Sequence, residues 1–316
     1  MSSSPGLAEV ARLAGVSLAT ASRVVSGRGP ASAASREAVR RAAAEVGYVP
    51  HPVASRLARG AGTRILFAVR DRRAGIVHDP FVTRAAAAMA AAVDADGLGV
   101  SLRHLPLDAA AGLERIAADR SVAAVVLAGH DSLDDVPAGL RGRFAAIGAD
   151  GLDVDSAAGI GALLRHLHVI GRRRIALVSG PAWLAAARAP LGAYTTLMRE
   201  AGLPIRVVPG DFTAGRGRLA AATVLRRWPD TDAIAAVSDA TAFGVLQSLA
   251  AAGVRVPCDV AVTGFDDIPV AACVSAALST ATHPVELIAA AAAKAALGAD
   301  SSARLFPSRP VLRSTA

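Results

Sequence analysis

The sequence contains little cysteine, and its two thiols, Cys258 and Cys273, have no CxxC or Cys/His spacing. Two such cysteines are too few for a disulfide framework and indicate no metal site. The N-terminus also lacks a signal-peptide pattern, because Glu9 and Arg12 interrupt it before a long apolar run develops. The apolar stretches elsewhere are alanine-rich and much shorter than the roughly 20 residues that span a bilayer. We therefore expect a cytoplasmic protein that has no membrane partner.

Charge is scarce overall and unevenly distributed along the chain. Charged residues are 19% and apolar residues 53% of the 316 positions, which is typical of a globular protein with two or three compact units. Of the net charge of +8, residues 1–60 carry +5, because eight arginines there face only three glutamates. A positive potential in a short segment favours a polyanionic partner such as nucleic acid, although a solvated helix surface explains the charge equally well.

Apolar periodicity predicts three short helices at the N-terminus. The first covers residues 7–14, Ser17 can cap a second that runs to Val25, and Ser32 can cap a third that reaches Val46. Glycine-bearing turns join the three segments. This pattern is typical of a minimal helix-turn-helix unit.

Pro50 and Pro52 prevent the third helix from continuing, because proline lacks a backbone N–H and restricts the residue before it. Residues 51–59 then predict a short hinge helix, and residues 60–63 a linker. The predicted domains are a helix-turn-helix domain at 1–50, a hinge and linker at 51–63 and a larger domain at 64–316.

From residue 64 onward, short apolar runs alternate with amphipathic helical segments. This rhythm is typical of a parallel sheet covered by helices, and it occurs twice in succession. We therefore predict two doubly wound α/β subdomains, with a ligand crevice at the carboxyl ends of their strands. The predicted strands are 65–69, 100–102, 122–127, 144–148, 175–179, 206–208, 234–237 and 260–264.

Several motifs follow one another along nearly the whole chain. They include LAEVARLAGVSLATASRVVS at 7–26, GYVPHPVASRLARG at 47–60, HDPF at 78–81, VSDATAFGVLQSLAAAGVRVPCDVAVTGFDDIP at 237–269 and LSTATHP at 278–284. In this order and spacing, they resemble the lactose-repressor (LacI/GalR) family. The resemblance implies a transcriptional repressor with a helix-turn-helix head and a periplasmic-binding-protein-like α/β body, controlled allosterically by a small ligand. It also implies that the protein is not an enzyme and needs no cofactor.

The resemblance implies which residues contact double-stranded DNA. Arg23 can bind a guanine bidentately in the major groove, whereas an isolated arginine would more often be a mere surface charge. Leu57 matches the family leucine that wedges into the minor groove, and the alternative is that it only packs its own short helix. The predicted DNA contacts are Ser17, Leu18, Ala19, Thr20, Ser22, Arg23, Ala54 and Leu57.

The resemblance also implies a set of effector contacts. Carboxylates with open acceptor positions suit hydroxyl-rich ligands, whereas Asp239 is expected to cap a helix. Pro190 stands where the family has a ligand-gripping arginine, which disfavours anionic ligands. We expect a neutral sugar or polyol, or a ligand with an amine, and a homodimer on a pseudo-palindromic operator. The predicted ligand contacts are Asp71, Phe81, Asp155, Pro190, Ser238 and Asp266.

Three alternatives remain at this stage. An enzyme would be expected to show a catalytic signature, but the sequence has no GxSxG, P-loop or HExxH motif. A sugar-binding transport protein would resemble residues 64–316, but it would need a signal peptide and would have no helix-turn-helix head. A DNA-binding protein whose pocket no longer senses a ligand is the third alternative.

Overall fold

The computed structural model describes residues 6–27, 29–49, 56, 62–130, 136–148, 151–299 and 305–316. Contacts divide the chain into two compact units, Met1–Ala61 and Gly62–Ala316. Most of the predicted hinge and linker at 51–63 lies outside the described residues.

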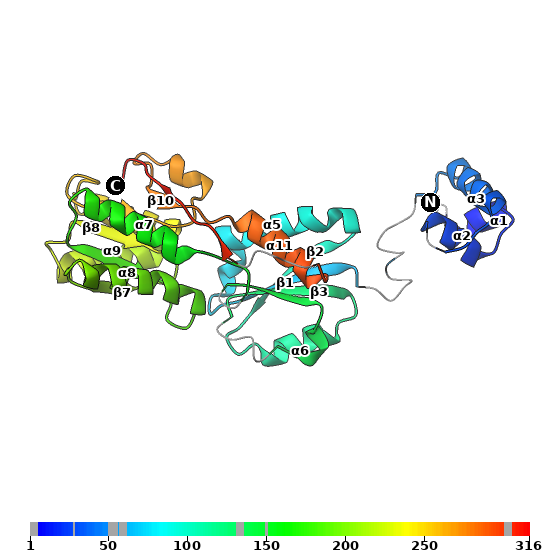
Figure 1. Ribbon diagram of the computed structural model, residues 1–316, viewed down its shortest axis with the longest axis horizontal. Helices are drawn as coiled ribbons and strands as arrows, with labels where there is room; N and C mark the ends of the chain where they lie inside the picture. The colour runs from blue at the N-terminus through cyan, green and yellow to red at the C-terminus, as the bar shows by residue number, and fades with distance from the viewer. Residues whose placement is uncertain are drawn as a thin grey trace. The chain divides into compact units, whose positions relative to one another are not determined.

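The described residues of the first unit contain the three helices that the periodicity predicts, which Figure 1 shows. Ser17 accepts a hydrogen bond from the backbone N–H of Thr20, and Ser32 accepts one from that of Ser35, so both predicted N-caps are present. A small core of valine and alanine holds the helices together. The helices are α1 (Leu7–Leu13), α2 (Leu18–Val25) and α3 (Ala33–Glu45).

The second unit begins with a parallel sheet in the order β2-β1-β3-β4. Alternate residues of β1 enter different cores: Ile65 and Phe67 pack on the face covered by α5 and α11, and Leu66 packs with Leu113 of α6 on the other. This two-residue period explains why the strand is apolar throughout. The elements are β1 (Arg64–Arg70), β2 (Gly99–Leu105), β3 (Val122–Ala128), β4 (Phe144–Ile147), α5 (Pro80–Val93), α6 (Ala110–Ala118) and α11 (Val285–Ala296).

A second parallel sheet has the order β7-β6-β8-β9, and it repeats the topology of the first. Ile175 of β6 packs with Leu163 and Tyr194 on one face, whereas Val178 packs with Val224 and Val245 on the other. The two predicted doubly wound subdomains are thereby confirmed. The elements are β6 (Ile175–Ser179), β7 (Arg206–Pro209), β8 (Ala233–Ala236), β9 (Ala261–Thr263), α7 (Ser156–Val169), α8 (Arg188–Glu200), α9 (Ala214–Arg227) and α10 (Asp239–Ala251).

The two subdomains are not simply successive along the chain. After β9 the chain returns to the first sheet, where α11 packs against α5, β3 and β4. Pairs of two-residue strands lie outside the two sheets. The strand β5 (Asp153–Val154) pairs with β11 (Leu305–Phe306), and β10 (Thr280–Ala281) pairs with β12 (Pro310–Val311). Short 3-10 turns complete the unit at η1 (Ala74–His78), η2 (Asp94–Asp96), η3 (Ala138–Leu140), η4 (Ala185–Ala187) and η5 (Pro269–Ala272).

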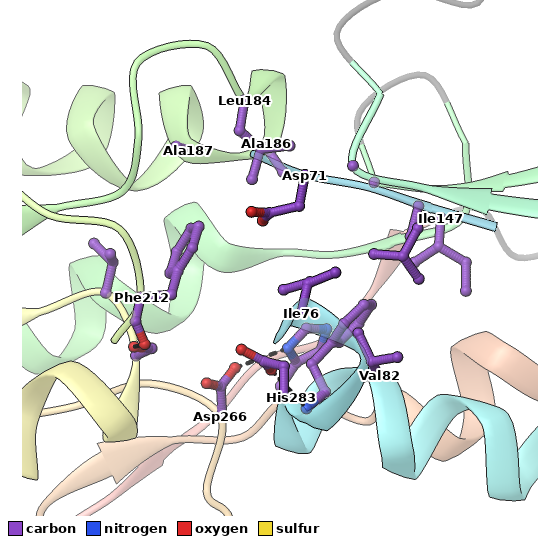
Figure 2. A pocket seen from close by; sticks show the side chains of 18 of the residues that line it. Asp71, Ile76, Val82, Ile147, Leu184, Ala186, Ala187, Phe212, Asp266 and His283 are labelled. Carbon is purple, nitrogen blue, oxygen red and sulfur yellow. Dashed lines mark hydrogen bonds and ion pairs between the residues drawn. The ribbon is translucent and has the colours of Figure 1, made fainter. Parts of the chain in front are cut away.

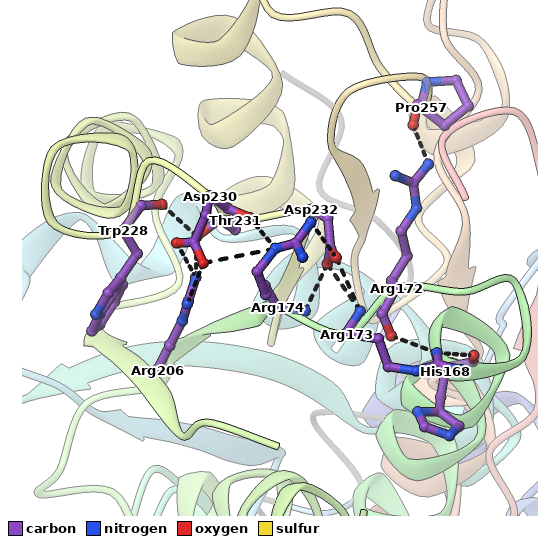
Figure 3. Close-up of polar contacts among 10 residues, drawn as sticks. All are labelled: His168, Arg172, Arg173, Arg174, Arg206, Trp228, Asp230, Thr231, Asp232 and Pro257. Atoms are coloured by element: carbon purple, nitrogen blue, oxygen red, sulfur yellow. Dashed lines mark hydrogen bonds and ion pairs between the residues drawn. The ribbon is translucent and has the colours of Figure 1, made fainter. Parts of the chain in front are cut away.

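A polar cluster lies where the α9–β8 connection meets the beginnings of β6 and β7 (Figure 3). Arg206 is buried and binds Asp230 through two hydrogen bonds of 2.9 Å. Its guanidinium also lies 5.8 Å from the ring of Trp228, which Arg227 covers at 4.8 Å. Trp228 therefore packs against two arginine side chains.

None of the helices in the described ranges combines the length and apolar character needed to cross a bilayer.

Candidate functional site

The exposed face of α2 carries the side chains predicted to contact DNA bases. Ala21 is fully buried against the other helices, whereas Leu18 is 54% exposed. Ala19, Ser22 and Arg23 are also exposed, on the face turned away from the core. The helix therefore presents an apolar edge at Leu18 and Ala19 and polar groups at its next turn.

The Arg23 side chain lies along its own helix in this structure. Its Nε donates to the carbonyl oxygen of Ala19, and its Nη1 donates to that of Pro30, both at 3.2 Å. A contact with a base requires these two exposed hydrogen bonds to be exchanged. The hydroxyl groups of Ser17 and Thr20 lie 2.9 Å apart at the start of the helix. Ala54 and Leu57 lie outside the described residues.

The larger unit has a cavity of about 190 Å³ at the carboxyl ends of its strands. Segments that follow β1, β3, β4, β6, β7, β8 and β9 line it, together with the segment after β10 (Figure 2). Most of its walls are apolar, which is typical of ligand sites with a few orienting polar groups. Its aromatic side chains are Phe81, Trp183, Phe212 and Phe265.

Asp266 and His283 form a polar pair in this cavity. The Nδ1 of His283 lies 3.0 Å from Oδ1 of Asp266, and its ring stacks on Phe81 at 5.5 Å between centroids. Asp266 also has a φ of 115°, a conformation that costs energy for a residue with a Cβ. Such strain persists only where surrounding contacts fix the backbone, and it is common at ligand sites. Asp266 and Phe81 thus lie where the sequence predicts ligand contacts.

Asp71 lies across the cavity from Asp266 and His283 (Figure 2). Its carboxylate is already bound by Arg73. Arg73 donates to it from Nε at 3.0 Å, from Nη2 at 3.1 Å and from its backbone N–H at 2.7 Å. The structure therefore offers a ligand the pair of Asp71 and Arg73 rather than a free carboxylate. Arg73 was not predicted from the sequence, because nothing distinguishes it from neighbouring surface arginines.

Asp155, a predicted ligand contact, lies outside the lining of the cavity. Its Oδ1 accepts a hydrogen bond of 2.9 Å from the backbone N–H of Ala158, so it is the N-cap of α7 and does not line the cavity. Asp153 lines the cavity instead. Burial raises the pKa of the Asp153 carboxyl above its usual range. The sequence could have indicated that Asp155 caps α7, because an aspartate directly before a helical segment is a strong capping residue.

Ser238 and Pro190 both line the cavity, as predicted. The Ser238 Oγ also caps α10 by accepting a hydrogen bond of 3.2 Å from the N–H of Thr241. Pro190 is buried, and proline offers a ligand no N–H group.

Asp239, which the sequence suggests as a helix cap, is not the capping residue of α10. Its carboxylate is fully buried and accepts hydrogen bonds from the N–H of Ile268 at 2.9 Å and from Oγ1 of Thr280 at 2.6 Å. Burial, and then the charge of Asp266, raise the pKa of Asp239 to about 7. This buried carboxylate joins the start of α10 to the segment after β9 and to β10.

Aspartates outnumber arginines in the cavity, which two histidines also line. Four aspartates line it, at positions 71, 79, 153 and 266, against two arginines, at positions 70 and 73. Burial chiefly raises the pKa of Asp79, and the charge of Asp266 adds to this effect. The arrangement provides hydrogen-bond acceptors beside aromatic faces. No metal-binding cluster of three or more side chains occurs in the parts of the chain that the structure describes.

A second hollow of about 410 Å³ adjoins the cavity. Asp71, Arg73 and Trp183 line both spaces, and the exposed side chains of Arg72 and Arg216 line only the second. Trp183 is half-buried at this junction. A ligand longer than one ring therefore has space to extend past Trp183.

Comparisons with known proteins match both units. A model of the bacterial regulatory proteins of the lacI family matches residues 6–51, and a model of the periplasmic binding protein-like domain matches residues 164–315. The HTH-type transcriptional regulator CelR of Thermobifida fusca is 33% identical over 307 residues, which cover 90% of this chain and 88% of CelR.

Solved structures share the fold. The lac repressor dimer bound to operator and the anti-inducer ONPF matches with a TM-score of 0.83 at 24% identity, over 99% of each chain. The complex of the transcriptional regulator CelR with cellobiose matches with a TM-score of 0.71 at 29% identity, over 99% of this chain and 100% of that one. With the helix-turn-helix head and the two α/β sheets, the sequence match shows that the chain belongs to the LacI family of DNA-binding transcriptional regulators, which are not enzymes.

Proposed function

We propose that this protein is a repressor that binds a pseudo-palindromic operator as a homodimer in the cytoplasm, and that a neutral sugar or polyol in the crevice controls this binding. The observation that carries the proposal is the pair of Asp266 and His283 against the ring of Phe81. It combines an apolar face for a sugar ring with a carboxylate acceptor for its hydroxyl groups.

The charge of the cavity supports an uncharged ligand. The lining has four aspartates against two arginines and two histidines, and Arg73 is already bound by Asp71. A phosphate or carboxylate in this space would face carboxylates without a free arginine from α8, because Pro190 lines the wall there. CelR, a relative whose structure contains cellobiose, supports a sugar, and the adjoining hollow offers space for a second ring.

The proposed control of DNA binding follows from where the lining residues lie. Phe81 belongs to α5 beside the first sheet, whereas Ser238 begins α10 beside the second. A ligand that contacts both sides favours one closure of the two subdomains over another. To change operator occupancy it must bind one closure better, and such couplings are typically about 1–3 kcal/mol.

On the DNA side, we propose that α2 enters the major groove of each half-site. Its exposed face carries Leu18, Ala19, Ser22 and Arg23, and its N-terminus carries the hydroxyl groups of Ser17 and Thr20. Two apolar side chains at the first turn suit thymine methyl groups. Two-fold symmetry then doubles a small interface, as in the operator-bound lac repressor dimer.

The test combines operator selection with ligand titration of the full chain. DNA bound from a random pool is sequenced, and its affinity is then measured with cellobiose, glucose, galactose, ribitol, glucose 6-phosphate and glucuronate. A palindromic consensus whose affinity changes with a neutral compound supports the proposal. An asymmetric single half-site, or a response to the anionic compounds alone, contradicts it. A protein that binds its operator but shows neither thermal stabilisation nor a DNA response with any compound would no longer sense a ligand.

A further inference from the structure

Arg84 lies on α5 three residues after Phe81, but it does not line the cavity. Its guanidinium binds Glu286 of α11 bidentately, with Nε donating at 2.7 Å to Oε1 and Nη2 donating at 2.9 Å to Oε2. This geometry alone describes an ion pair that joins two packed helices.

The same guanidinium also binds the backbone of the two polar residues of the cavity. Its Nη2 donates to the carbonyl oxygen of His283 at 3.2 Å, and its Nη1 donates to that of Asp266 at 3.4 Å. These acceptors belong to different segments, one after β9 and one after β10. One side chain from the first subdomain therefore binds the backbone carbonyl groups of both Asp266 and His283.

The backbone of Asp266 needs such support because its φ of 115° is unfavourable. Its N–H donates to the carbonyl oxygen of Ala281 at 2.9 Å, and its carboxylate is bound by His283. Arg84 adds a donor to the carbonyl oxygen of Asp266, within the parallel bridge that joins Asp266 to Thr282. The side chain of Arg84 is only 22% exposed, so water replaces these bonds poorly.

We propose that Arg84 is a positioning residue of the effector site: it holds the backbone of Asp266 and His283 so that their side chains meet the ligand beside Phe81. This inference rests on the proposed function for the ligand, but the geometry that it assigns exists without one. Glu286, whose side chain is 54% exposed, orients the guanidinium and does not touch the two segments through any of these bonds.

Three variants of the full chain separate positioning from simple helix pairing. Arg84→Gln replaces the forked guanidinium by a shorter neutral amide that cannot reach both carbonyl groups, and Glu286→Gln removes the charge of the partner but leaves the guanidinium donors. The double exchange Arg84→Glu with Glu286→Arg restores an ion pair between α5 and α11 while leaving position 84 without a donor. Thermal unfolding of all three measures the helix-pairing contribution.

The first readout uses no ligand. In protein labelled with ¹³C at the histidine Cε1, the His283 resonance is assigned by its loss in His283→Gln. Its position reports the ring current of the stacked Phe81. We expect Arg84→Gln and the double exchange to move this resonance, and Glu286→Gln to leave it near its wild-type position. An unmoved resonance in folded Arg84→Gln, or equal movement in all three variants, overturns the proposal.

The second readout is the affinity for cellobiose, or for glucose if cellobiose does not bind. We expect Arg84→Gln to weaken binding about tenfold, as for the loss of two hydrogen bonds, and the double exchange to remain equally weak. Recovery of affinity in the double exchange would show that only the ion pair matters and would overturn the positioning role. If neither sugar binds the wild-type protein, the proposed neutral ligand fails, and the resonance still decides the role of Arg84.

Discussion

Asp266 accepts a hydrogen bond from His283 at 3.0 Å, although 17 positions separate the two residues in the sequence. Asp266 follows β9 of the second sheet, and His283 immediately precedes the return of the chain to α11 on the first. A ligand that touches this pair therefore contacts the segment that joins the two subdomains.

Asp153 lines the cavity and Asp155 caps α7, so the two aspartates should respond differently to substitution. Asp153→Asn should weaken binding of a neutral sugar about tenfold, because a cavity carboxylate becomes a weaker acceptor. Asp155→Ala should leave sugar affinity unchanged and lower the free energy of unfolding by about 1 kcal/mol through loss of the cap. Calorimetry and urea unfolding measure these effects. Asp155→Asn is the matched control, because asparagine caps well, and a large loss of sugar affinity in it would contradict the assignment.

The raised pKa of Asp239 predicts that the free energy of unfolding depends on pH. Its pKa is raised to about 7 in the folded protein, against about 3.9 in an unfolded chain, so the folded state holds the proton more tightly. The contribution of Asp239 to the free energy of unfolding is therefore complete below about pH 4, and it is lost as the pH rises to about 7. Asp239→Asn cannot ionise and should remove this part of the slope in urea unfolding measured from about pH 5 to about pH 8. Parallel slopes for the two proteins would show that Asp239 does not titrate in this range.

Arg23 should determine operator specificity more than general DNA affinity. Arg23→Gln is expected to lower operator affinity by about 1–3 kcal/mol, because a bidentate contact with guanine is lost. The matched control is Arg40→Gln, an exposed arginine on α3 that should weaken operator and random DNA by similar small factors. Fluorescence anisotropy at one salt concentration compares the affinities of the wild-type protein and both variants for operator and for random DNA. Equal loss of specificity in both variants would remove Arg23 as a base contact.

Leu57 lies outside the described residues, so its role remains a prediction from the sequence. If it wedges into the minor groove, Leu57→Ala should weaken operator binding far more than binding to random DNA, because only a kinkable step rewards the wedge. Competition assays with both DNAs measure the difference. Equal losses would mean that Leu57 only packs its own helix.

The two tryptophans should report ligand binding unequally. Trp183 lines the cavity and the adjoining hollow, whereas Trp228 packs against Arg206 and Arg227 elsewhere in the second subdomain. Adding a binding sugar should change tryptophan fluorescence in Trp228→Phe and leave it nearly unchanged in Trp183→Phe. A response that disappears only in Trp228→Phe would place the sugar away from the proposed site.

The local features that the sequence predicted are those set by short-range rules. Ser17 and Ser32 cap helices as expected, because capping depends on neighbouring residues in the chain. The strands of both sheets also match, since their apolar runs are bounded by turns. The cap that Asp155 forms also follows a local rule. Asp239 does not cap α10 as expected, because its carboxylate is buried against Ile268 and Thr280, which are neighbours only in space. Arg84 and Arg73 gave no signal for the same reason.

The return of α11 to the first sheet has a consequence for synthesis of the chain. Until Val285–Ala296 have left the ribosome, the apolar faces of α5, β3 and β4 lack the helix that covers them. The first subdomain to be translated is therefore among the last to be completed, and its uncovered surface is available to chaperones in the meantime. A ribosome stalled shortly before residue 285 should carry a nascent chain with a folded head and a protease-sensitive first sheet.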